Sequence, residues 1–392
     1  MIIVSVAGPS MNEALAQVEV SSRYADAFEF RLDLIKEPPL SFLLTSTRRP
    51  IIVSCRSARE GGRFDGSDAE RLEILRAAVQ IGVEYVDIEL RDGQAIIDEF
   101  LESGVKVIVS HHQFEKRSVN PERIYAQLRQ SGAHVLKFAY MAHDAAYIRY
   151  AIEFLRLARA ERQKAIAVAM GECGEPTRIL YRKFGGWATY ASAEDAAPAA
   201  PGQLPASMMK KLFRSDQLTS GTKVFGVVGN PVRQSRGIFV HNPLFQRAGK
   251  NFVYCRFEVH NLAAFAQHVL PWLSGCSVTL PHKQSIMKYV DRVDATTKGI
   301  RAVNTIVRKR GKLFATNTDA PGALDAIEKI SKVAGKRMLV LGAGGAARSI
   351  AYEAKRRGAH VLIANRTESV AKKLAQEFKI TFVPHAELAK TE

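Results

Sequence analysis

Two reactive side chains stand near the ends of apolar runs in the sequence. His112 ends the run KVIVSHH, and Lys137 lies between Leu136 and Phe138 in the run HVLKFAY. A lysine in such a run either extends its amine to solvent or lies in an enclosed site, where a neutral amine can attack a carbonyl. Because buried lysine is rare, these two runs alone favour the first alternative. The rest of the sequence favours the second.

Similar apolar runs recur through the first two hundred residues. Eight strands are predicted, starting near residues 2, 28, 51, 85, 106, 135, 165 and 187. Their starts are about 20 to 35 residues apart, which leaves room each time for the crossover helix of a parallel sheet. One such helix has a predicted capping box, formed by Ser67 and Glu70. Eight units of this kind predict an α/β fold, a (β/α)8 TIM barrel.

Alternation along the strands separates polar from apolar side chains. In FEFRLDL, Glu29, Arg31 and Asp33 share one face, and in VDIEL the same holds for Asp87 and Glu89. We expect the polar face to line the lumen, where Asp33, Asp87 and Glu89 either form ion pairs on the barrel floor or belong to a site. Barrel active sites lie at the carboxyl ends of strands. The candidates at strand ends are Glu29, Arg31, Arg56, His112, Lys137, Met170 and the segment after Ala191.

The segments EFRLD, SCRSAREGG, SHHQF, VLKFAYM and APGQ, in this order, resemble class I 3-dehydroquinate dehydratase over residues 1–220. The resemblance implies that Lys137 forms a Schiff base with the substrate, that His112 is the general acid and base, and that Glu60 is its carboxylate partner. It implies no cofactor and no metal for this half. The family commonly has serine where this chain has Ala199, which removes one hydrogen bond of the closing loop. The substrate-binding residues implied are Glu29, Arg31 and Arg56 near the hydroxyls, Arg178 on the carboxylate, and Gln203 in the closing loop.

The implied chemistry needs these residue types. A lysine amine condenses with the C3 ketone of 3-dehydroquinate, and the iminium acidifies the C2 proton so that the C1 hydroxyl can leave. A histidine takes the C2 proton and returns it to the hydroxyl, while a guanidinium fork suits the carboxylate. His111 lies on the opposite face of its strand from His112, so we expect it to pack outside the lumen.

A polar segment near residues 215–222 predicts a linker, after which a new strand begins at Val224. Strand-to-loop junctions follow in VFGVVGNPVRQSRGIFVHN, SGCSVTLPHK, GIRAVNTI and ATNTDAPG. Polar side chains at such junctions can converge on a ligand. By spacing alone, Lys283 and Asp319 form either a surface salt bridge or a functional pair.

These junctions resemble the substrate-binding domain of shikimate dehydrogenase over residues 223–322. The resemblance implies that Lys283 and Asp319 are the catalytic pair. It also implies that Thr279 and Asn304 bind the substrate hydroxyls and that Ser235 contacts the carboxylate.

Two segments depart from that family. The usual Ser-x-Ser-Pro is replaced by Ser235, Arg236, Gly237 and Ile238, and Ser277 stands where asparagine is usual. One carboxylate-binding hydroxyl is therefore missing, and Arg236 is an alternative source of charge. A related cyclitol acid such as quinate becomes an alternative substrate.

The segment KRMLVLGAGGAARSIAYEAKRRGAHVLIANRT, within residues 323–392, is typical of a nucleotide-binding strand, glycine-rich turn, helix and strand. The alternative is a glycine turn that binds no ligand. The second strand ends without an acidic residue, which favours a ribose 2′-phosphate and implies NADP. Such a sheet normally continues further, so we expect an incomplete Rossmann domain whose effect on reduction is left open. The candidate cofactor residues are Gly342, Gly344, Gly345, Ala346, Asn365, Arg366 and Thr367.

The chain of 392 residues carries a net charge of +17, which favours anionic partners. Its basic residues are scattered, which favours a solvated basic surface over a nucleic-acid groove. No apolar run reaches membrane-spanning length. Four cysteines, with neither metal-ligand nor disulfide-framework spacing, suit a reducing cytoplasm. The oligomeric state is left open.

Taken together, these segments predict an enzyme that converts 3-dehydroquinate to 3-dehydroshikimate in the barrel and reduces this product to shikimate with NADPH in the second half. The alternatives are a dehydratase whose second half is inactive or serves as a binding module, and a nucleic-acid binder.

Overall fold

The structure is a computed structural model that describes residues 1–36, 40–114 and 119–390. The chain divides into two compact units, which are treated separately here. The first contains Met1–Val224 and Arg233–Pro271, and the second contains Phe225–Val232 and Trp272–Glu392.

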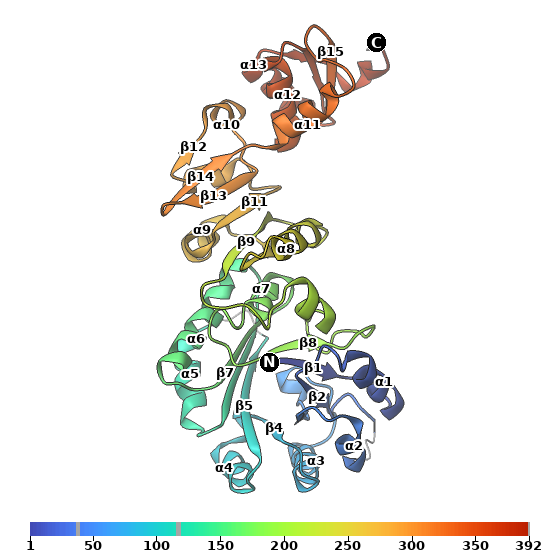
Figure 1. The fold of residues 1–392 in the computed structure, drawn as a ribbon, viewed down its shortest axis with the longest axis vertical. Helices are drawn as coiled ribbons and strands as arrows, with labels where there is room; N and C mark the ends of the chain where they lie inside the picture. Colours follow the sequence, from blue (N-terminus) through green and yellow to red (C-terminus); the bar gives the residue numbers. More distant parts are fainter. Residues whose placement is uncertain (37–39, 115–118, 391–392) are drawn as a thin grey trace. The chain divides into compact units, whose positions relative to one another are not determined.

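The predicted (β/α)8 barrel is confirmed in the first unit (Figure 1). Its sheet has the order β7-β6-β5-β4-β3-β2-β1-β8, and β1 pairs in parallel with both β2 and β8. Every predicted strand is present. The strands are β1 (Ile2–Val6), β2 (Ala27–Arg31), β3 (Ile51–Ser54), β4 (Tyr85–Glu89), β5 (Lys106–Gln113), β6 (Val135–Met141), β7 (Ala165–Met170) and β8 (Thr189–Ser192).

Helices connect the strands, as the spacing predicts. The capping box at the start of α3 is confirmed, because Ser67 accepts from the Glu70 N–H and the Ser67 N–H donates to the Glu70 carboxylate. Leu72, Leu75 and Ala78 form the buried face of this helix. The helices are α1 (Met11–Ser21), α2 (Leu43–Ser46), α3 (Asp68–Gln80), α4 (Gln94–Glu102), α5 (Pro121–Gln130), α6 (Ile148–Ala160) and α7 (Glu175–Ile179).

The lumen of the barrel is layered. Ile3, Ala27, Ile52, Ile108 and Ile166 belong to one buried apolar cluster. Ile3, Ala27, Ile52 and Ile108 each lie two residues before a polar residue of the same face, because strand side chains alternate with a period of two. β7, which carries Ile166, is apolar throughout. The floor is therefore apolar, and Asp33, Asp87 and Glu89 form their ion pairs with arginines above it.

The first unit also contains a segment that the sequence assigns to the second domain. This segment holds α8 (Gly237–Arg247), β10 (Phe252–Glu258) and α9 (Leu262–His268). The Gln246 side-chain amide donates to two backbone carbonyls, those of Lys211 and Leu212. Arg256 on β10 lies 3.4 Å from the Glu175 carboxylate on α7. These contacts place the segment with the barrel, although the domain boundaries at residues 220 and 322 stay predictions.

In the second unit, strands follow one another in the order β9, β11, β13, β14, β12. A separate sheet, in the order β15-β16-β17, packs with α12 and α13 around Val340, Ala351, Ile363 and Leu374. The strands are β9 (Lys223–Gly229), β11 (Gly275–Val278), β12 (Arg292–Val293), β13 (Thr305–Lys309), β14 (Lys312–Thr316), β15 (Arg337–Leu341), β16 (His360–Ala364) and β17 (Thr381–Phe382). The helices are α10 (Ala295–Ile300), α11 (Asp319–Glu328), α12 (Gly345–Arg356) and α13 (Glu368–Phe378).

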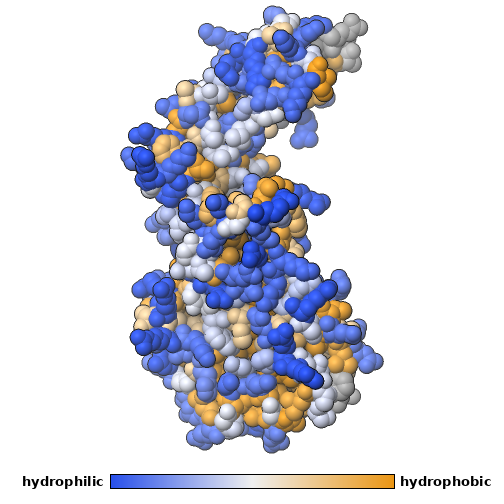
Figure 2. Space-filling view, viewed as in Figure 1, coloured by the Kyte–Doolittle hydropathy of each residue, from blue (hydrophilic) through white to orange (hydrophobic). Residues whose placement is uncertain are grey.

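Hydrophilic side chains are spread over the face of the molecule seen in Figure 2, with hydrophobic ones between them. This distribution fits the expectation of a solvated surface. Among the helices that the structure describes, none combines the length and apolar character needed to cross a bilayer.

Candidate active site

The amine of Lys137 lies at the centre of a polar layer in the barrel lumen. The side chain points inward from β6 and is 6% exposed. Its Nζ donates to Asp87 Oδ2 at 2.8 Å and to Glu29 Oε1 at 3.3 Å. The same nitrogen lies 4.1 Å from the centroid of the Tyr190 ring. Two carboxylates and an aromatic ring thus enclose the amine.

His112 and Glu60 form a buried pair beside this amine. His112 lies on β5, and Glu60 ends a short 3-10 helix (Ala58–Glu60) that follows β3. His112 Nδ1 lies 2.8 Å from Glu60 Oε2, and the His112 backbone N–H donates to the same oxygen at 3.2 Å. Because Nδ1 is engaged, Nε2 is the nitrogen available to a ligand.

Burial opposes charge on both members of this pair. It lowers the pKa of His112 well below its usual value, and Arg56 and Lys137 lower it further. Burial also raises the pKa of Glu60 to about 8, against the opposing influence of Arg56. One labile proton is therefore shared by a pair that is neutral overall, which leaves an imidazole able to accept a proton.

Arg56 follows β3 and joins the carboxylates around the lumen. Its guanidinium lies 2.9 Å from Asp87 Oδ1 and donates to Ser110 Oγ at 2.7 Å. Burial opposes the charge of Asp87, but Arg56 and Lys137 outweigh burial and lower the pKa of Asp87 to about 2. Glu89 also lies 3.5 Å from Arg56. Asp87 thus contacts both Arg56 and Lys137, whereas Glu89 accepts from the Ser57 N–H at 2.8 Å and fixes the segment after β3.

Arg31 and Glu29 lie side by side on the lumen face of β2. Arg31 makes a bidentate pair with Asp33, at 2.9 and 2.7 Å, which identifies Asp33 as a structural partner. Glu29 accepts from Ser5 Oγ at 3.0 Å in addition to its contact with Lys137. Both residues line the cavity described below, as the sequence predicts.

Arg178 is a buried cation without a carboxylate partner among the described residues. It lies on α7 and is 2% exposed. Its guanidinium donates to the carbonyls of Tyr190 and Pro201 at 3.3 and 3.0 Å, and Nε has no partner. Burial lowers its pKa to about 10, so the group remains charged at neutral pH. An uncompensated buried guanidinium is suited to bind an anion.

The loop over the cavity is held through its backbone. Gln203 Oε1 accepts from the N–H groups of Ala199 and Ala200, and Nε2 donates to Ser5 Oγ at 3.0 Å. Arg31 donates to the Ala199 carbonyl at 3.3 Å. The position where the resembling family has serine is therefore anchored without a side-chain hydroxyl.

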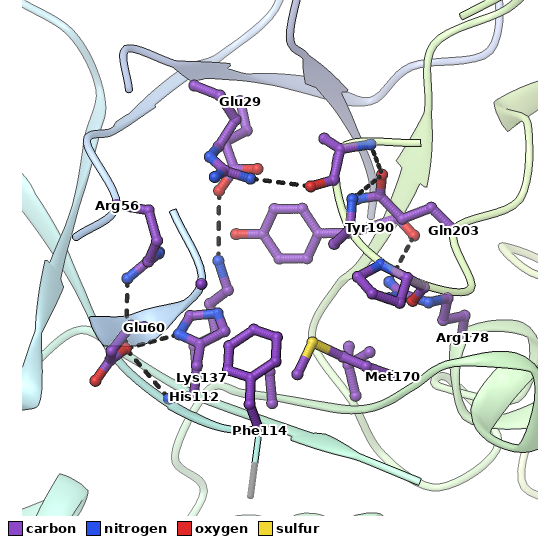
Figure 3. A pocket seen from close by; sticks show the side chains of 17 residues that line it. Glu29, Arg56, Glu60, His112, Phe114, Lys137, Met170, Arg178, Tyr190 and Gln203 are labelled. Atoms are coloured by element: carbon purple, nitrogen blue, oxygen red, sulfur yellow. Dashed lines mark hydrogen bonds and ion pairs between the residues drawn. The ribbon is translucent and has the colours of Figure 1, made fainter. Parts of the chain in front are cut away.

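These groups surround one cavity, shown in Figure 3. It is lined by every residue that the sequence predicts for the barrel site: Glu29, Arg31, Arg56, Glu60, His112, Lys137, Arg178 and Gln203. Tyr190 and Phe114 also line it and are missing from the prediction. Parity along WATYAS places Tyr190 on the face of Ser192 and Ala188, and this signal was available in the sequence.

His111 lies outside this cavity, as expected. Its ring stacks on Phe138 with centroids 6.2 Å apart, and its Nδ1 lies 3.9 Å from Glu60 Oε1. Burial lowers the pKa of His111.

A second polar cluster lies in the second unit, where loops follow the strand ends. Lys283 Nζ donates to Asp319 Oδ2. Asn304 Nδ2 donates to Asp319 Oδ1 at 2.7 Å and to Thr318 Oγ1 at 2.9 Å. The side chains of Lys283 and Asp319 are 15% and 30% exposed, so a ligand can reach this pair.

Thr279, Ser235 and Ser277 have no hydrogen bond with Lys283 or Asp319 among the described residues. The Thr279 N–H donates to the Val228 carbonyl at 2.9 Å, which fixes the end of β11 beside β9. Ser235 lies in the first unit, where its Oγ accepts from the Gly237 N–H at 3.3 Å. Ser277 lies on β11, between Val227 and Thr305.

The glycine-rich turn joins β15 to α12. Gly342 has φ +109°, which favours glycine, and a Cβ at Gly344 would meet open space. Gly345 and Ala346 begin α12, whose first turn has no side-chain cap. Free N–H groups beside open space fit a pyrophosphate. Gly345 also approaches Lys283, because a Cβ there would lie 2.9 Å from Lys283 Cδ.

The residues predicted to bind the ribose of the cofactor follow β16. Asn365 Nδ2 donates to the Thr367 carbonyl at 2.9 Å, and Arg366 between them is exposed. The turn thus presents a guanidinium and no carboxylate, which fits a ribose 2′-phosphate.

Three family models match successive parts of the chain. A family model described as Type I 3-dehydroquinase matches residues 2–220. Models of the shikimate dehydrogenase substrate binding domain and of shikimate / quinate 5-dehydrogenase match residues 227–306 and 325–391.

Similar proteins cover most of the chain. A chloroplastic bifunctional 3-dehydroquinate dehydratase/shikimate dehydrogenase of Arabidopsis thaliana is 36% identical over 382 residues, which span 90% of this chain and 62% of that protein. The shikimate biosynthesis protein AroDE of Chlamydia pneumoniae is 29% identical over 96% of this chain and 78% of its own length.

A crystal structure of a type I 3-dehydroquinate dehydratase from Clostridium difficile matches with a TM-score of 0.50 and 24% identity, over 54% of this chain and 91% of that one. This likeness supports the barrel fold. Because the first family model covers more than half of the 392 residues, this chain belongs to the type I 3-dehydroquinase family.

Proposed function

We propose that the barrel dehydrates 3-dehydroquinate to 3-dehydroshikimate through a Schiff base on Lys137. The observation that carries this proposal is the meeting of three groups in one cavity: the buried Lys137 amine, the His112–Glu60 pair, and the uncompensated Arg178 guanidinium. A nucleophile, a proton carrier and an anion site are the parts that such a reaction needs.

The steps follow from these positions. Lys137 adds to the C3 ketone, and loss of water leaves an iminium that withdraws electrons from C2. His112 takes the C2 proton, the electron pair forms the C1–C2 double bond, and the C1 hydroxyl leaves with that proton. Hydrolysis then releases the product and restores the amine.

Arg178 orients the substrate in this scheme. Its guanidinium has no carboxylate partner among the described residues, so a substrate carboxylate would supply the missing charge. A charge-assisted hydrogen bond of this kind contributes about 1.5–3 kcal/mol. Glu29, Arg31 and Arg56 are placed to bind the ring hydroxyls, and Gln203 to hold the loop over the ligand.

For the second half we propose NADPH-dependent reduction of 3-dehydroshikimate to shikimate. Bound NADPH supplies the hydride. Lys283 and Asp319 hold a proton beside the substrate oxygen, Asn304 orients Asp319, and the turn at Gly342–Gly345 binds the pyrophosphate. Ser235 and Thr279 are proposed substrate contacts. The chain spans 62% of the length of its Arabidopsis relative.

We place both activities in a reducing cytoplasm. The four cysteines are buried and free, which agrees with that location. The Arabidopsis relative is a chloroplast protein.

Reduction with borohydride tests the first activity. In the presence of 3-dehydroquinate, borohydride should trap a covalent adduct, and peptide mass analysis should locate it on Lys137. An adduct on another lysine, or none, would contradict the assignment. Spectrophotometric assays with 3-dehydroquinate, and with NADPH and 3-dehydroshikimate, test the two reactions separately.

A further inference from the structure

The hydroxyl of Tyr190 is a buried polar group that the proposed reaction does not yet use. Tyr190 lies on β8 and is 4% exposed. Its Oη has no hydrogen-bond partner among the residues that the structure describes. Because an unsatisfied buried hydroxyl destabilises a folded protein, this group needs an explanation.

The position of the ring is fixed on several sides. Tyr190 pairs with Ile3 of β1, and its backbone carbonyl accepts from Arg178 at 3.3 Å. Lys137 Nζ stands over the ring, 4.1 Å from its centroid. Figure 3 shows the ring reaching into the cavity that Lys137 shares with Glu29. The ring is therefore held beside the reactive amine, and its hydroxyl belongs to the lining of the same cavity.

The hydroxyl keeps its proton and is therefore able to donate a hydrogen bond. Burial raises the pKa of Tyr190 well above its usual value, and the charges of Glu29 and Asp87 raise it further. A neutral phenol aimed at a space where negative charge develops is a suitable stabilising group.

The proposed chemistry creates such a charge next to Lys137. When the amine adds to the ketone, the N–C bond forms and the carbonyl electron pair moves onto oxygen. That oxygen takes one proton from the attacking nitrogen and a second, which replaces the one that the lysine ammonium loses before it attacks, so that it leaves as water when the iminium forms. The former carbonyl oxygen is two bonds from Nζ throughout the addition. Because Nζ lies over the Tyr190 ring, this oxygen forms close to that residue.

We propose that the Tyr190 hydroxyl donates a hydrogen bond to the substrate oxygen on the carbon that Lys137 attacks. The proposal rests on the Schiff-base function proposed above. It assigns Tyr190 to the addition step, before His112 acts, with no transfer of the phenol proton.

The substitution Tyr190→Phe tests this role, because it removes the hydroxyl and retains the ring under Lys137. We expect the rate of formation of the borohydride-trapped adduct to fall on the order of ten- to hundredfold. The temperature of unfolding of the free protein should stay the same or rise, because an unsatisfied buried group is removed. Rapid mixing with 3-dehydroquinate, followed by quenching in borohydride and mass analysis, gives the adduct rate.

Tyr140→Phe is the matched control on β6. The Tyr140 hydroxyl is also buried, but it donates to the Tyr147 carbonyl at 2.7 Å and accepts from the Ala151 N–H at 3.0 Å. This variant should lower the unfolding temperature and leave the adduct rate unchanged, so the two variants have opposite signatures.

Two outcomes would overturn the assignment of Tyr190. One is an unchanged adduct rate in Tyr190→Phe while the wild type forms its adduct on Lys137; the function then stands and the role of the hydroxyl falls. The other is a lowered unfolding temperature, which would identify a structural hydroxyl. A wild type that forms no adduct would instead refute the Schiff-base function itself.

Discussion

Each half of the chain has a lysine paired with carboxylates, but the two lysines have different surroundings. Lys137 is enclosed by Glu29, Asp87 and the Tyr190 ring, and its site is built from strands of a single barrel. Lys283 pairs with Asp319 on loops after strand ends, and both side chains are partly exposed. The barrel supplies its own low-dielectric surroundings, whereas the second site requires its ligands to exclude water.

The two halves also differ in the burial of the arginine proposed to bind an anion. In the barrel, the uncompensated cation is buried Arg178, so the anion site exists before substrate binds. In the second half, the candidate cation for the cofactor is the exposed Arg366, whose contact salt can screen. The variants below separate the two halves by the size of their effects.

Replacing Lys137 with alanine should have the largest effect. Dehydration should fall on the order of 10⁴-fold or more, because the covalent route is lost. NADPH oxidation with 3-dehydroshikimate should be unchanged, since Lys283 and Asp319 lie in the other compact unit. Assays of both reactions on the same preparation provide the measurement. Loss of both activities in a folded variant would contradict the independence of the sites.

Replacing Lys283 with alanine should give the reverse pattern. Reduction of 3-dehydroshikimate should fall about 10²- to 10⁴-fold, the usual contribution of a positioned proton donor. Asp319→Asn serves as a near-isosteric companion variant, because it keeps the contact with Asn304 and removes the charge. Dehydration should match the wild type in both, and an intact reductase rate in both would identify a simple salt bridge.

Arg366→Ala should have a smaller effect, confined to cofactor choice. We expect wild-type protein to bind NADPH about tenfold more tightly than NADH, a value near the lower end for a charge-assisted contact. The lower end is expected because Val370, one turn later, adds no second cation. The variant should lose the preference. Calorimetry with both cofactors at fixed salt measures it, and equal affinities in the wild type would refute it.

Glu60→Gln should change a different quantity, the pH dependence of the free energy of unfolding. Glu60 has its pKa raised to about 8 in the fold, above its usual value of 4.5. The folded state therefore binds more protons than the unfolded chain, and stability falls as pH rises from about 4.5 to about 8. The variant should lack this contribution. Urea unfolding at pH 5, 7 and 9 gives the free energy of unfolding at each pH. This free energy should fall less with rising pH in the variant than in the wild type, and an equal fall in both would contradict the shared proton.

Much of the barrel site could be predicted because its information is local. The strands are short apolar runs at regular intervals, and parity alone places Glu29, Arg31 and Asp87 on the lumen face. The capping box of α3 is equally local. The roles of Arg178 and Gln203 came from family resemblance, because a five-residue helix and a loop carry no periodic pattern.

The parts that sequence reasoning missed depend on tertiary contacts. Parity places Tyr190 on a face of its strand, but nothing in the neighbouring residues shows that its hydroxyl lacks a partner. The grouping of Arg233–Pro271 with the barrel depends on contacts such as Arg256 with Glu175, which join residues far apart in the chain. Such contacts cannot be read from a linear pattern.

The loop over the barrel cavity has a consequence for how its sequence can vary. Its anchors are backbone groups: the Ala199 carbonyl and N–H, the Ala200 N–H and the Pro201 carbonyl. Side chains at positions 199 and 200 can therefore change in evolution while the anchors persist, and the serine-to-alanine difference is one such change. In a library randomised at positions 199 and 200, most variants should stay active. In a library randomised at Gln203, few variants should stay active.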